Sequence, residues 1–457
     1  YSENQGDWVG SGSITHAEKG DFMGNTAGLV WAGLPGSPVK LRTEDIPDTH
    51  EPKYEVAKRV PGLKTPSVWF PHTILGISTS GILNYDAKGL MGPFEGQLFV
   101  GDQGQSKIMR VYLEKIKGVY QGVVFPFREG FSSGILRMNW GSDGSMFVGM
   151  TSRGWGSTGN MMFGLQQMVW NGKMPFEMQK VEVQSDGFEV SFTQPVDIKT
   201  ARNPASWKFS TFTYQYHHNY GSPVINQAVR NIKAIEVSPD HLKVRLVLDS
   251  MKLGYIHEIR AEGIKSADSA IELLHNYGYY TLNKLPDNDK LLITEQNKVT
   301  IPVPMQQHVM ADMKMPSKPI AKYTSSQPKE WTKGPDRSFV IGTKPGLKYD
   351  IETITVKAGT KIKITFKNND DMLHNLVITK PGTADQVGLL AANMGLNGER
   401  LNYIPKSSDI LFHTRILRPK ESDTIYFTAP AEAGDYTYVC TFPGHYVLMR
   451  GTLRVTK

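Results

Sequence analysis

One loop near the end of the chain decides the fold, and it reads Cys440-Thr441-Phe442-Pro443-Gly444-His445-Tyr446-Val447-Leu448-Met449. The loop places a thiol, an imidazole and a thioether within a single turn-forming segment. Pro443 fixes φ and Gly444 permits a tight turn, so the loop is built to return His445 toward Cys440. Far upstream, His374 stands just before a strand-like apolar run and supplies a second imidazole.

These side chains have the chemistry of a type 1 copper site. A thiolate and two imidazoles in a trigonal plane, with a thioether at longer axial distance, form the blue-copper coordination set. Each residue alone is more often structural, but the spacing of all of them together favours copper and one-electron transfer. The predicted copper ligands are His374, Cys440, His445 and Met449.

The rest of the chain is predicted to be mostly β. Its 457 residues exceed what one hydrophobic core supports, so roughly two to four domains are expected. Glycine (44) and proline (27) are frequent, and short β-rich runs alternate with turn signals. Long helical periodicity is scarce, which indicates stacked sheets as the basis of the fold.

Residues 1–174 contain a repeat. Gly96-Gln97-Leu98-Phe99-Val100-Gly101 recurs about 48 residues later as Gly144-Ser145-Met146-Phe147-Val148-Gly149, and each copy precedes a second β-rich run. This period predicts a partial β-propeller; the alternative is two unrelated strands that each follow a glycine turn. About three such blades fit, whereas closed propellers have about four to eight. We therefore expect the missing blades to come from a portion upstream of Tyr1 or from another chain.

Three further regions follow. Residues 175–286 alternate inward and outward side chains and predict an Ig-like β-sandwich. Residues 287–336 are polar and proline-rich and predict a linker. Its thioether and imidazole groups suit Cu(I), so a transient copper-loading site is the alternative to methionines that pack on neighbouring domains. The side chains concerned are Met305, His308, Met310, Met313 and Met315.

Residues 337–457 form the last predicted domain, which contains the copper loop. Among its expected elements are strands at 361–367 and 435–440 and a helical insert at 384–394. Cys440 is the one cysteine of the chain, so an internal disulfide is excluded.

Charge and hydropathy restrict the classes of partner. The net charge is +7, but Lys and Arg are scattered, which argues against nucleic acid as a partner. No apolar run reaches about 18 residues, so no transmembrane span is expected. The chain begins at Tyr1 without a leader, and we expect either a removed signal or an upstream portion.

Residues 350–457 resemble the azurin and auracyanin group of cupredoxins. The resemblance rests on His374-Asn375, His413-Thr414, the copper loop and the closing run Gly451-Thr452-Leu453. It implies a cupredoxin Greek-key β-sandwich and assigns the four ligand roles to the residues named above. Azurins have a glycine before the first ligand, and its carbonyl approaches copper axially. Leu373 stands there in this chain, so its backbone carbonyl is the corresponding weak axial candidate.

The same resemblance implies an electron port around His445. An apolar rim at this position excludes water and lets a redox partner dock weakly and leave quickly. We expect the edge of His445 to reach the surface through this rim. The port residues are Phe442, Pro443, Val447 and Leu448.

The first 286 residues resemble the later half of a bacterial propeller family related to sorbosone and soluble sugar dehydrogenases. The stretches that carry this resemblance are Asn4-Gln5-Gly6-Asp7-Trp8, Gly96 to Val111, Arg153-Gly154-Trp155-Gly156-Ser157 and, in the sandwich, Asp186-Gly187-Phe188. The resemblance implies pyrroloquinoline quinone as a cofactor of the complete propeller. His72 and Arg153 are the catalytic candidates, with His72 as a base that takes a hydroxyl proton; a purely structural His72 is the alternative. No Cys-x-x-Cys-His is present, so no haem c is attached.

Two functions of different class follow. In the first, a type 1 copper domain takes electrons from a propeller-type sugar or alcohol dehydrogenase module or from a redox partner such as a cytochrome, in the periplasm or at the cell surface of a bacterium. In the second, the protein is a non-catalytic surface assembly or a glycan- or protein-binding protein with an accessory copper domain. The sequence leaves open whether the chain is part of an oxidoreductase.

Overall fold

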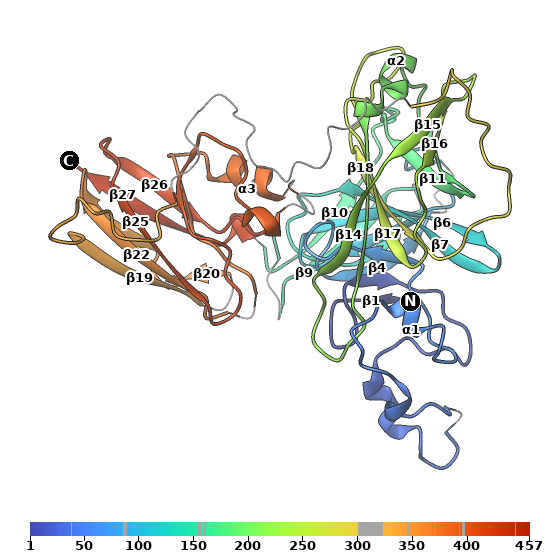
Figure 1. The fold of residues 1–457 in the computed structure, drawn as a ribbon, viewed down its shortest axis with the longest axis horizontal. Helices are drawn as coiled ribbons and strands as arrows, with labels where there is room; N and C mark the ends of the chain where they lie inside the picture. The colour runs from blue at the N-terminus through green and yellow to red at the C-terminus, as the bar shows by residue number, and fades with distance from the viewer. Residues whose placement is uncertain are drawn as a thin grey trace. The chain divides into compact units, whose positions relative to one another are not determined.

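The computed structural model describes residues 1–37, 39–85, 89–153, 157–159, 161–299, 323–344, 347–370, 372–392, 394, 398–443 and 445–457 (Figure 1). The chain forms two compact units. The first comprises Tyr1–Ser152 with Met161–Pro304, and the second comprises Arg153–Asn160 with Met305–Lys457. Both units consist of β-sheets with few short helices, which confirms the predicted mostly-β class.

The strands described in the first unit are β1 (Ser2–Glu3), β2 (Gly12–Ile14), β3 (Val68–Phe70), β4 (Thr79–Asn84), β5 (Leu98–Asp102), β6 (Lys107–Ile116), β7 (Val119–Arg128), β8 (Ile135–Trp140), β9 (Met146–Thr151), β10 (Phe163–Met168), β11 (Met178–Gln184), β12 (Gly187–Phe192), β13 (Trp207–Tyr214), β14 (Val224–Arg230), β15 (Ile232–Val237), β16 (Lys243–Leu248), β17 (Tyr255–Ala261) and β18 (Tyr277–Leu282). Its short helices are η1 (Thr26–Trp31), η2 (Thr43–Asp45), α1 (Lys53–Val56), α2 (Ile198–Arg202) and η3 (Pro204–Ser206).

The sequence repeat forms matching strands in two successive meanders. Strands β4 to β7 pair antiparallel, each with the next, and β8 to β10 do the same. Gly96 and Gly144 take left-handed φ values of 75° and 78° just before β5 and β9. Glycine adopts this conformation without strain, so each copy turns the chain into the second strand of its meander. A Cβ on Gly81 of β4 would lie 3.0 Å from the carbonyl oxygen of Leu136 in β8, so the two meanders pack closely.

The first meander continues into a larger sheet. Strand β7 also pairs with β18, with Val124 opposite Tyr279. The eight strands run in the order β14-β13-β17-β18-β7-β6-β5-β4, and a second sheet runs β11-β12-β16-β15. Phe188 and Phe209 stack between the two sheets at 6.2 Å in one hydrophobic core. The larger sheet thus crosses residue 174, where the sequence pattern predicts a boundary between propeller and sandwich; that boundary stays a prediction.

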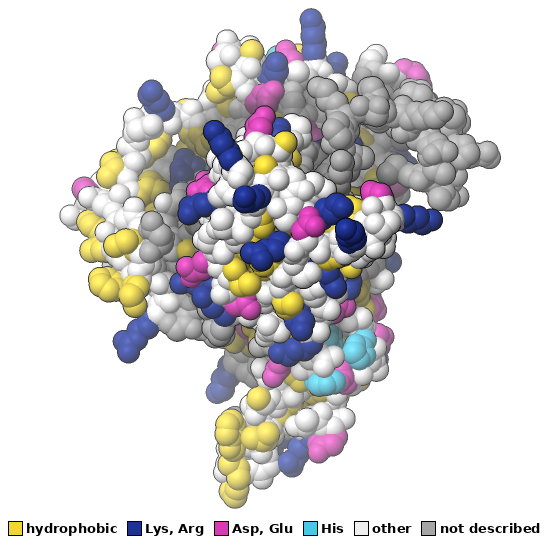
Figure 2. All heavy atoms as spheres, turned by 90° about the vertical axis from the view of Figure 1, so that its left-hand side faces the viewer, with side chains coloured by type: hydrophobic (Ala, Val, Ile, Leu, Met, Phe, Trp, Pro, Cys, Tyr) yellow, Lys and Arg dark blue, Asp and Glu magenta, His cyan; other side chains and the backbone are white. Residues whose placement is uncertain are grey.

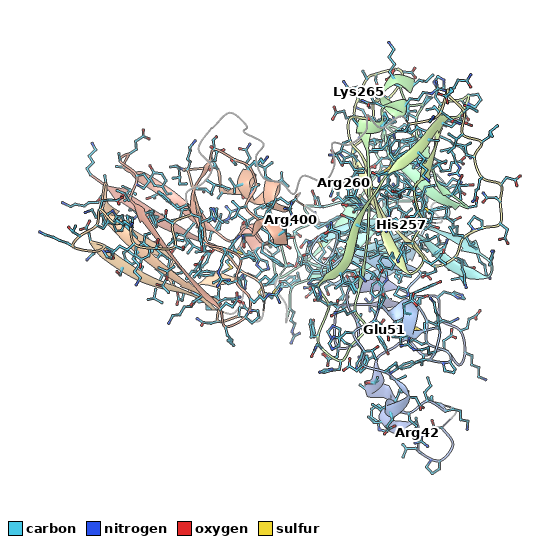
Figure 3. The ribbon with its side chains drawn as sticks, in the orientation of Figure 1. Arg42, Glu51, His257, Arg260, Lys265 and Arg400 are labelled. Carbon is cyan, nitrogen blue, oxygen red and sulfur yellow. The ribbon has the colours of Figure 1, made fainter. Side chains whose placement is uncertain are left out.

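Two buried ionisable side chains, Arg110 and His257, avoid an unpaired charge in different ways. Arg110 of β6 lies between the rings of Phe94 and Phe125. Its guanidinium also donates to Gln97 Oε1 at 2.6 Å. His257 of β17, marked in Figure 3, is fully buried, and burial lowers its pKa to about 3. An unpartnered buried charge is costly, so the arginine is enclosed by acceptors and rings while the histidine stays neutral.

The strands described in the second unit are β19 (Arg337–Lys344), β20 (Lys348–Tyr349), β21 (Thr353–Lys357), β22 (Lys361–Lys367), β23 (Val377–Thr379), β24 (Ile410–His413), β25 (Ser422–Thr428), β26 (Gly434–Val439) and β27 (Arg450–Thr456). Its helices are α3 (Ala384–Ala392), η5 (Glu399–Leu401) and η6 (His445–Val447).

The second unit is a two-sheet sandwich, as the resemblance implies. One sheet runs β20-β19-β22-β25 and the other β21-β27-β26-β23-β24. Strand β22 alternates, with Ile362, Ile364 and Phe366 buried in the core between the sheets. Its intervening residues are partly exposed, which is the period expected of a strand with one buried face. Strand β23 and the end of β26 thereby bring the segments around His374 and Cys440 together.

Both described ends of the predicted linker pack on their own units. In the first unit, the carbonyl oxygen of Asn297 accepts the backbone N–H of Ile235 at 2.8 Å. In the second, the carbonyl oxygen of Thr324 accepts the backbone N–H of Tyr426 at 2.9 Å. The proposed copper-loading methionines and His308 lie within 300–322, outside the described residues.

The surface view places basic side chains among acidic ones. Figure 2 shows Lys and Arg interspersed with Asp and Glu over the face that it presents. Such mixing does not create the single-sign field that favours an anionic polymer. Among the described residues, no helix combines the length and apolar character needed to cross a membrane.

Candidate metal centre

Three side chains converge in the second unit. Cys440 Sγ lies 3.7 Å from His374 Nδ1 and 3.6 Å from His445 Nδ1, and the two nitrogens are 3.2 Å apart. The centre of this triangle is about 2 Å from each atom, and nitrogen and sulfur ligands bind first-row metals at roughly 2.0–2.3 Å. Within the described residues, this is the one group of three or more His, Cys, Asp or Glu side chains with metal-binding spacing.

The backbone on both sides fixes His374 in place. Its N–H donates to the carbonyl oxygen of Leu417 at 3.1 Å, and the N–H of Leu417 donates back at 2.8 Å. The residue is fully buried just before β23. Leu373, whose carbonyl is the weak axial candidate, is half-buried against the core, and its role stays a prediction.

The loop after β26 folds back on itself as its sequence indicates. The N–H of Cys440 donates to the carbonyl oxygen of Met449 at 3.0 Å, so the two ends of the loop are joined. The N–H of His445 donates to the carbonyl oxygen of Phe442 at 3.0 Å, and the N–H of Met449 donates to His445 at 2.8 Å. Met449 is fully buried in the same cluster as Cys440. These backbone hydrogen bonds return His445 and Met449 toward the thiol.

Comparison with known proteins identifies this part of the chain. Residues 338–456 match the family model described as copper binding proteins, plastocyanin/azurin family. Auracyanin-A of Chloroflexus aurantiacus is 42% identical over 119 residues, which are 25% of this chain and 72% of that protein. The chain belongs to the plastocyanin/azurin family. We refer to residues 338–456 as the azurin-type domain.

Other relatives cover the same part of the chain. Azurin-1 of Alcaligenes xylosoxydans is 32% identical over 127 residues, or 26% of this chain and 96% of that protein. Among solved structures, a reduced auracyanin from Roseiflexus castenholzii is 36% identical, covers 27% of this chain and 100% of its own, and has a TM-score of 0.25. The family and the cluster of His374, Cys440 and His445 together support type 1 copper as the cofactor of the azurin-type domain.

A side-chain amide joins the two segments that carry the cluster. Asn375 Nδ2 donates to Thr441 Oγ1 at 2.8 Å, and the N–H of Thr441 donates to Asn375 Oδ1 at 2.8 Å. Thr441 Oγ1 in turn donates to the carbonyl oxygen of Tyr403 at 2.7 Å. All of these atoms are buried or part-buried, where hydrogen bonds hold geometry best. Because Asn375 follows His374 and Thr441 follows Cys440, this pair of bonds sets the separation of the two chain segments.

The electrostatics of His374 depend on two negative neighbours. Burial lowers the pKa of His374, but Asp370 and Cys440 outweigh it and raise the pKa to about 9. Asp370 Oδ2 lies 3.4 Å from His374 Nε2, on the opposite side of the ring from Cys440. A carboxylate at one ring nitrogen orients the imidazole and keeps the proton there. Nδ1 is thereby left as the nitrogen that faces the cluster.

The residues predicted as the electron port differ in exposure. Phe442 and Pro443 are buried and Leu448 is half-buried, while the side chain of Val447 lies outside what the structure describes. His445 is 1% exposed, so the expectation that its edge reaches solvent is not met in this structure. The ring of Phe442 packs against His445 with centroids 4.7 Å apart. The port assignment therefore stays a prediction.

Helix α3 supports the loop from its other side. A Cβ built on Gly388 would lie 2.1 Å from the ring of Tyr446, so the helix and η6 touch at a position that accepts glycine alone. Sequence reasoning expected the helix but not this contact. Asp370 and Thr441 were missed as well; their one available signal is that each lies within four residues of a predicted ligand.

The two catalytic candidates fall in different units. His72 follows β3 in the first unit, where burial lowers its pKa to about 4. Its backbone N–H donates to Ser11 Oγ at 2.9 Å. Arg153 follows β9 but is grouped with the second unit. A part for either residue in quinone chemistry stays a prediction.

Proposed function

We propose that this protein transfers electrons through a type 1 copper centre held by His374, Cys440 and His445, with Met449 as the axial ligand. The observation that carries the proposal is the convergence of two Nδ1 atoms and one Sγ around a point at metal-binding distance. Thiolate, imidazole and thioether are the donors that suit both Cu(I) and Cu(II). When bound, the copper ion supplies a one-electron change without any proton transfer.

The residues of the chain supply rigidity and the exclusion of water. His374, Cys440 and Met449 are fully buried, which keeps water from the ligand positions. The amide of Asn375 and the backbone bond between Cys440 and Met449 hold the ligands in place. Ligands that do not move when the charge changes keep the energetic cost of electron transfer small.

We assign the electron port to the rim formed by Phe442, Pro443, Val447 and Leu448. The packing of Phe442 against His445 supports this assignment, because it connects the rim to a predicted ligand ring. The partner would be a redox protein, such as a cytochrome or a dehydrogenase module, in the periplasm or at the surface of a bacterium.

The first unit is proposed to be part of a quinone-dependent sugar or alcohol dehydrogenase propeller. Support comes from the two meanders β4–β7 and β8–β10, in which the sequence repeat occupies equivalent strands β5 and β9. Further blades, from an upstream portion or another chain, would complete the ring and the pyrroloquinoline quinone site, with His72 and Arg153 as candidate residues.

A non-catalytic surface assembly or glycan- or protein-binding role is the second candidate. The observation in its favour is that both described ends of the predicted linker are packed, at Asn297 and at Thr324. Packed ends shorten the chain available for an azurin-type domain to move between donor and acceptor.

The visible spectrum of the purified protein tests the copper proposal. The oxidised protein is expected to be blue, with strong absorption near about 600 nm from charge transfer between the Cys440 thiolate and Cu(II). Cys440→Ser should abolish this band. A Cys440→Ser protein that keeps the band would contradict the assignment, and quinone extracted from native material would separate the two functions of the first unit.

A further inference from the structure

Tyr349 occupies a buried position behind the metal centre. It ends β20, is 1% exposed, and its hydroxyl donates to the carbonyl oxygen of Asn375 at 2.7 Å. Its ring packs edge-on against Tyr438 and Phe366, with centroids 5.2 and 5.8 Å apart. A tyrosine hydroxyl in an apolar core is costly unless it finds a partner. Here the partner is the carbonyl group of Asn375, the residue that directly follows His374.

The hydroxyl holds a residue that is also held through its side chain. The amide of Asn375 exchanges two hydrogen bonds with Thr441, next to Cys440. Tyr349 fixes the main chain of Asn375 at the same time. With the main chain and side chain both bonded, the position of Asn375 is restrained at two points, and so is the start of the segment that leads back to His374.

Tyr349 also lies within electrostatic range of the thiolate. Burial raises its pKa well above 10, and the negative charge of Cys440 raises it further. The hydroxyl is therefore protonated at neutral pH, where it can donate to the Asn375 carbonyl oxygen.

We propose that Tyr349 is a positioning residue for electron transfer: its hydroxyl locks the Asn375 main chain and thereby sets the reduction potential and colour of the copper centre. This inference rests on the proposed function. Cu(II) prefers tetragonal coordination, whereas the cluster presents a trigonal set. If the hydroxyl is removed, the His374 segment gains freedom relative to Cys440, and a relaxed ligand set favours Cu(II).

The test compares Tyr349→Phe with Tyr438→Phe in the full-length, copper-loaded protein. Tyr438 is a fully buried tyrosine in contact with Tyr349. It lies in β26 two residues before Cys440, but its hydroxyl donates to the carbonyl oxygen of Ile351 at 2.5 Å and not to a residue next to a ligand. Each variant thus loses one tyrosine hydroxyl and leaves one backbone carbonyl oxygen without the hydrogen bond that this hydroxyl donated. Reduction potential, visible spectrum and Cu(II) EPR are measured for both.

Tyr349→Phe is expected to shift the Cu(II)/Cu(I) equilibrium about three- to tenfold toward Cu(II), where tenfold corresponds to about 59 mV for one electron. The band near about 600 nm should weaken relative to absorption at shorter wavelength. Tyr438→Phe should lose comparable stability while its potential and spectrum stay those of the wild type. A merely structural role for Tyr349 predicts that neither variant changes the potential, and that result would overturn the proposal, as would equal shifts in both.

A second measurement keeps the test decisive if Tyr349→Phe fails to fold. Replacing all tyrosines by 3-fluorotyrosine strengthens the phenol as a donor without altering the packing shape. The potential should then rise in the wild-type protein and equally in Tyr438→Phe; an unchanged potential overturns the proposal. A wild-type protein that binds no copper or shows no blue band instead contradicts the proposed function itself.

Discussion

His374 and His72 are both enclosed histidines that the sequence singles out, yet their surroundings give them opposite charge states. Around His374, Asp370 and Cys440 outweigh burial and raise the pKa to about 9. Around His72, burial dominates and lowers the pKa to about 4. His374 also has two other donor atoms within 3.7 Å, and the described structure groups no such set around His72. Burial alone therefore does not mark a histidine as a candidate metal ligand, whereas the convergence of other donor atoms marks His374 as one.

The largest expected effect comes from removing each ring in turn. His374→Gly should weaken copper binding at least about 100-fold and abolish the blue band, because one corner of the ligand triangle is lost. Imidazole added to the solution should enter the space and restore part of the colour. His72→Gly should leave the copper affinity and the spectrum unchanged. Copper titration followed by absorption measures both, and bleaching by His72→Gly would abolish the distinction.

A smaller effect is expected on the stability of the metal-free protein, to which the two histidines contribute with opposite pH dependence. The folded pKa of His374, about 9, lies above the unfolded value near 6.5, so its contribution to stability is complete below about 6.5 and is lost as pH rises toward 9. The folded pKa of His72, about 4, lies below that value, so stability falls as pH drops from about 6.5 toward 4. Denaturant titrations from pH 4 to about 10 should show both slopes.

Matched substitutions identify the source of each slope. His374→Gln should flatten the alkaline side alone, and His72→Gln the acidic side alone. If His374→Gln left the alkaline slope intact, the Asp370 and Cys440 interactions would not control the charge of His374 as described.

The smallest effect concerns the axial position. Met449→Gln should keep copper bound and the protein blue, but it should lower the reduction potential by about 59 mV or more, which is a tenfold change in the Cu(II)/Cu(I) equilibrium. The reason is that an amide oxygen stabilises Cu(II) more than a thioether does. Met178→Gln, at an equally buried methionine in the first unit, should reduce stability without moving the potential. Voltammetry of both variants makes the comparison. An unchanged potential in Met449→Gln would remove Met449 from the coordination set.

Local patterns in the sequence predicted the parts of the site that are close together along the chain. The strand expected at 361–367 has the same bounds as β22, because its alternation of polar and apolar residues is strict. The expected helix at 384–394 corresponds to α3, which ends at Ala392. The turn residues of the copper loop likewise predicted that His445 returns toward Cys440.

Local patterns could not predict contacts between residues that lie far apart in the sequence. Tyr349 bonds Asn375 from a short strand that the sequence did not indicate, and nothing in its neighbours marks it. The pairing of β7 with β18 joins segments far apart in sequence, which no local period encodes. Asp370 carries no signal of its own, since an acidic residue near a turn is ordinary. These features depend on which surfaces meet after the sheets have formed.

The pairing of β7 with β18 has a consequence for how the first unit unfolds. Because the meander β4–β7 belongs to the same sheet as β14, β13, β17 and β18 and pairs with β18, neither half can unfold without exposing an edge strand of the other. The two halves should therefore behave as one cooperative foldon in native-state hydrogen exchange. A fragment that ends at residue 174 would present β7 as a bare template for intermolecular pairing, so it should aggregate, whereas the intact unit keeps that template occupied.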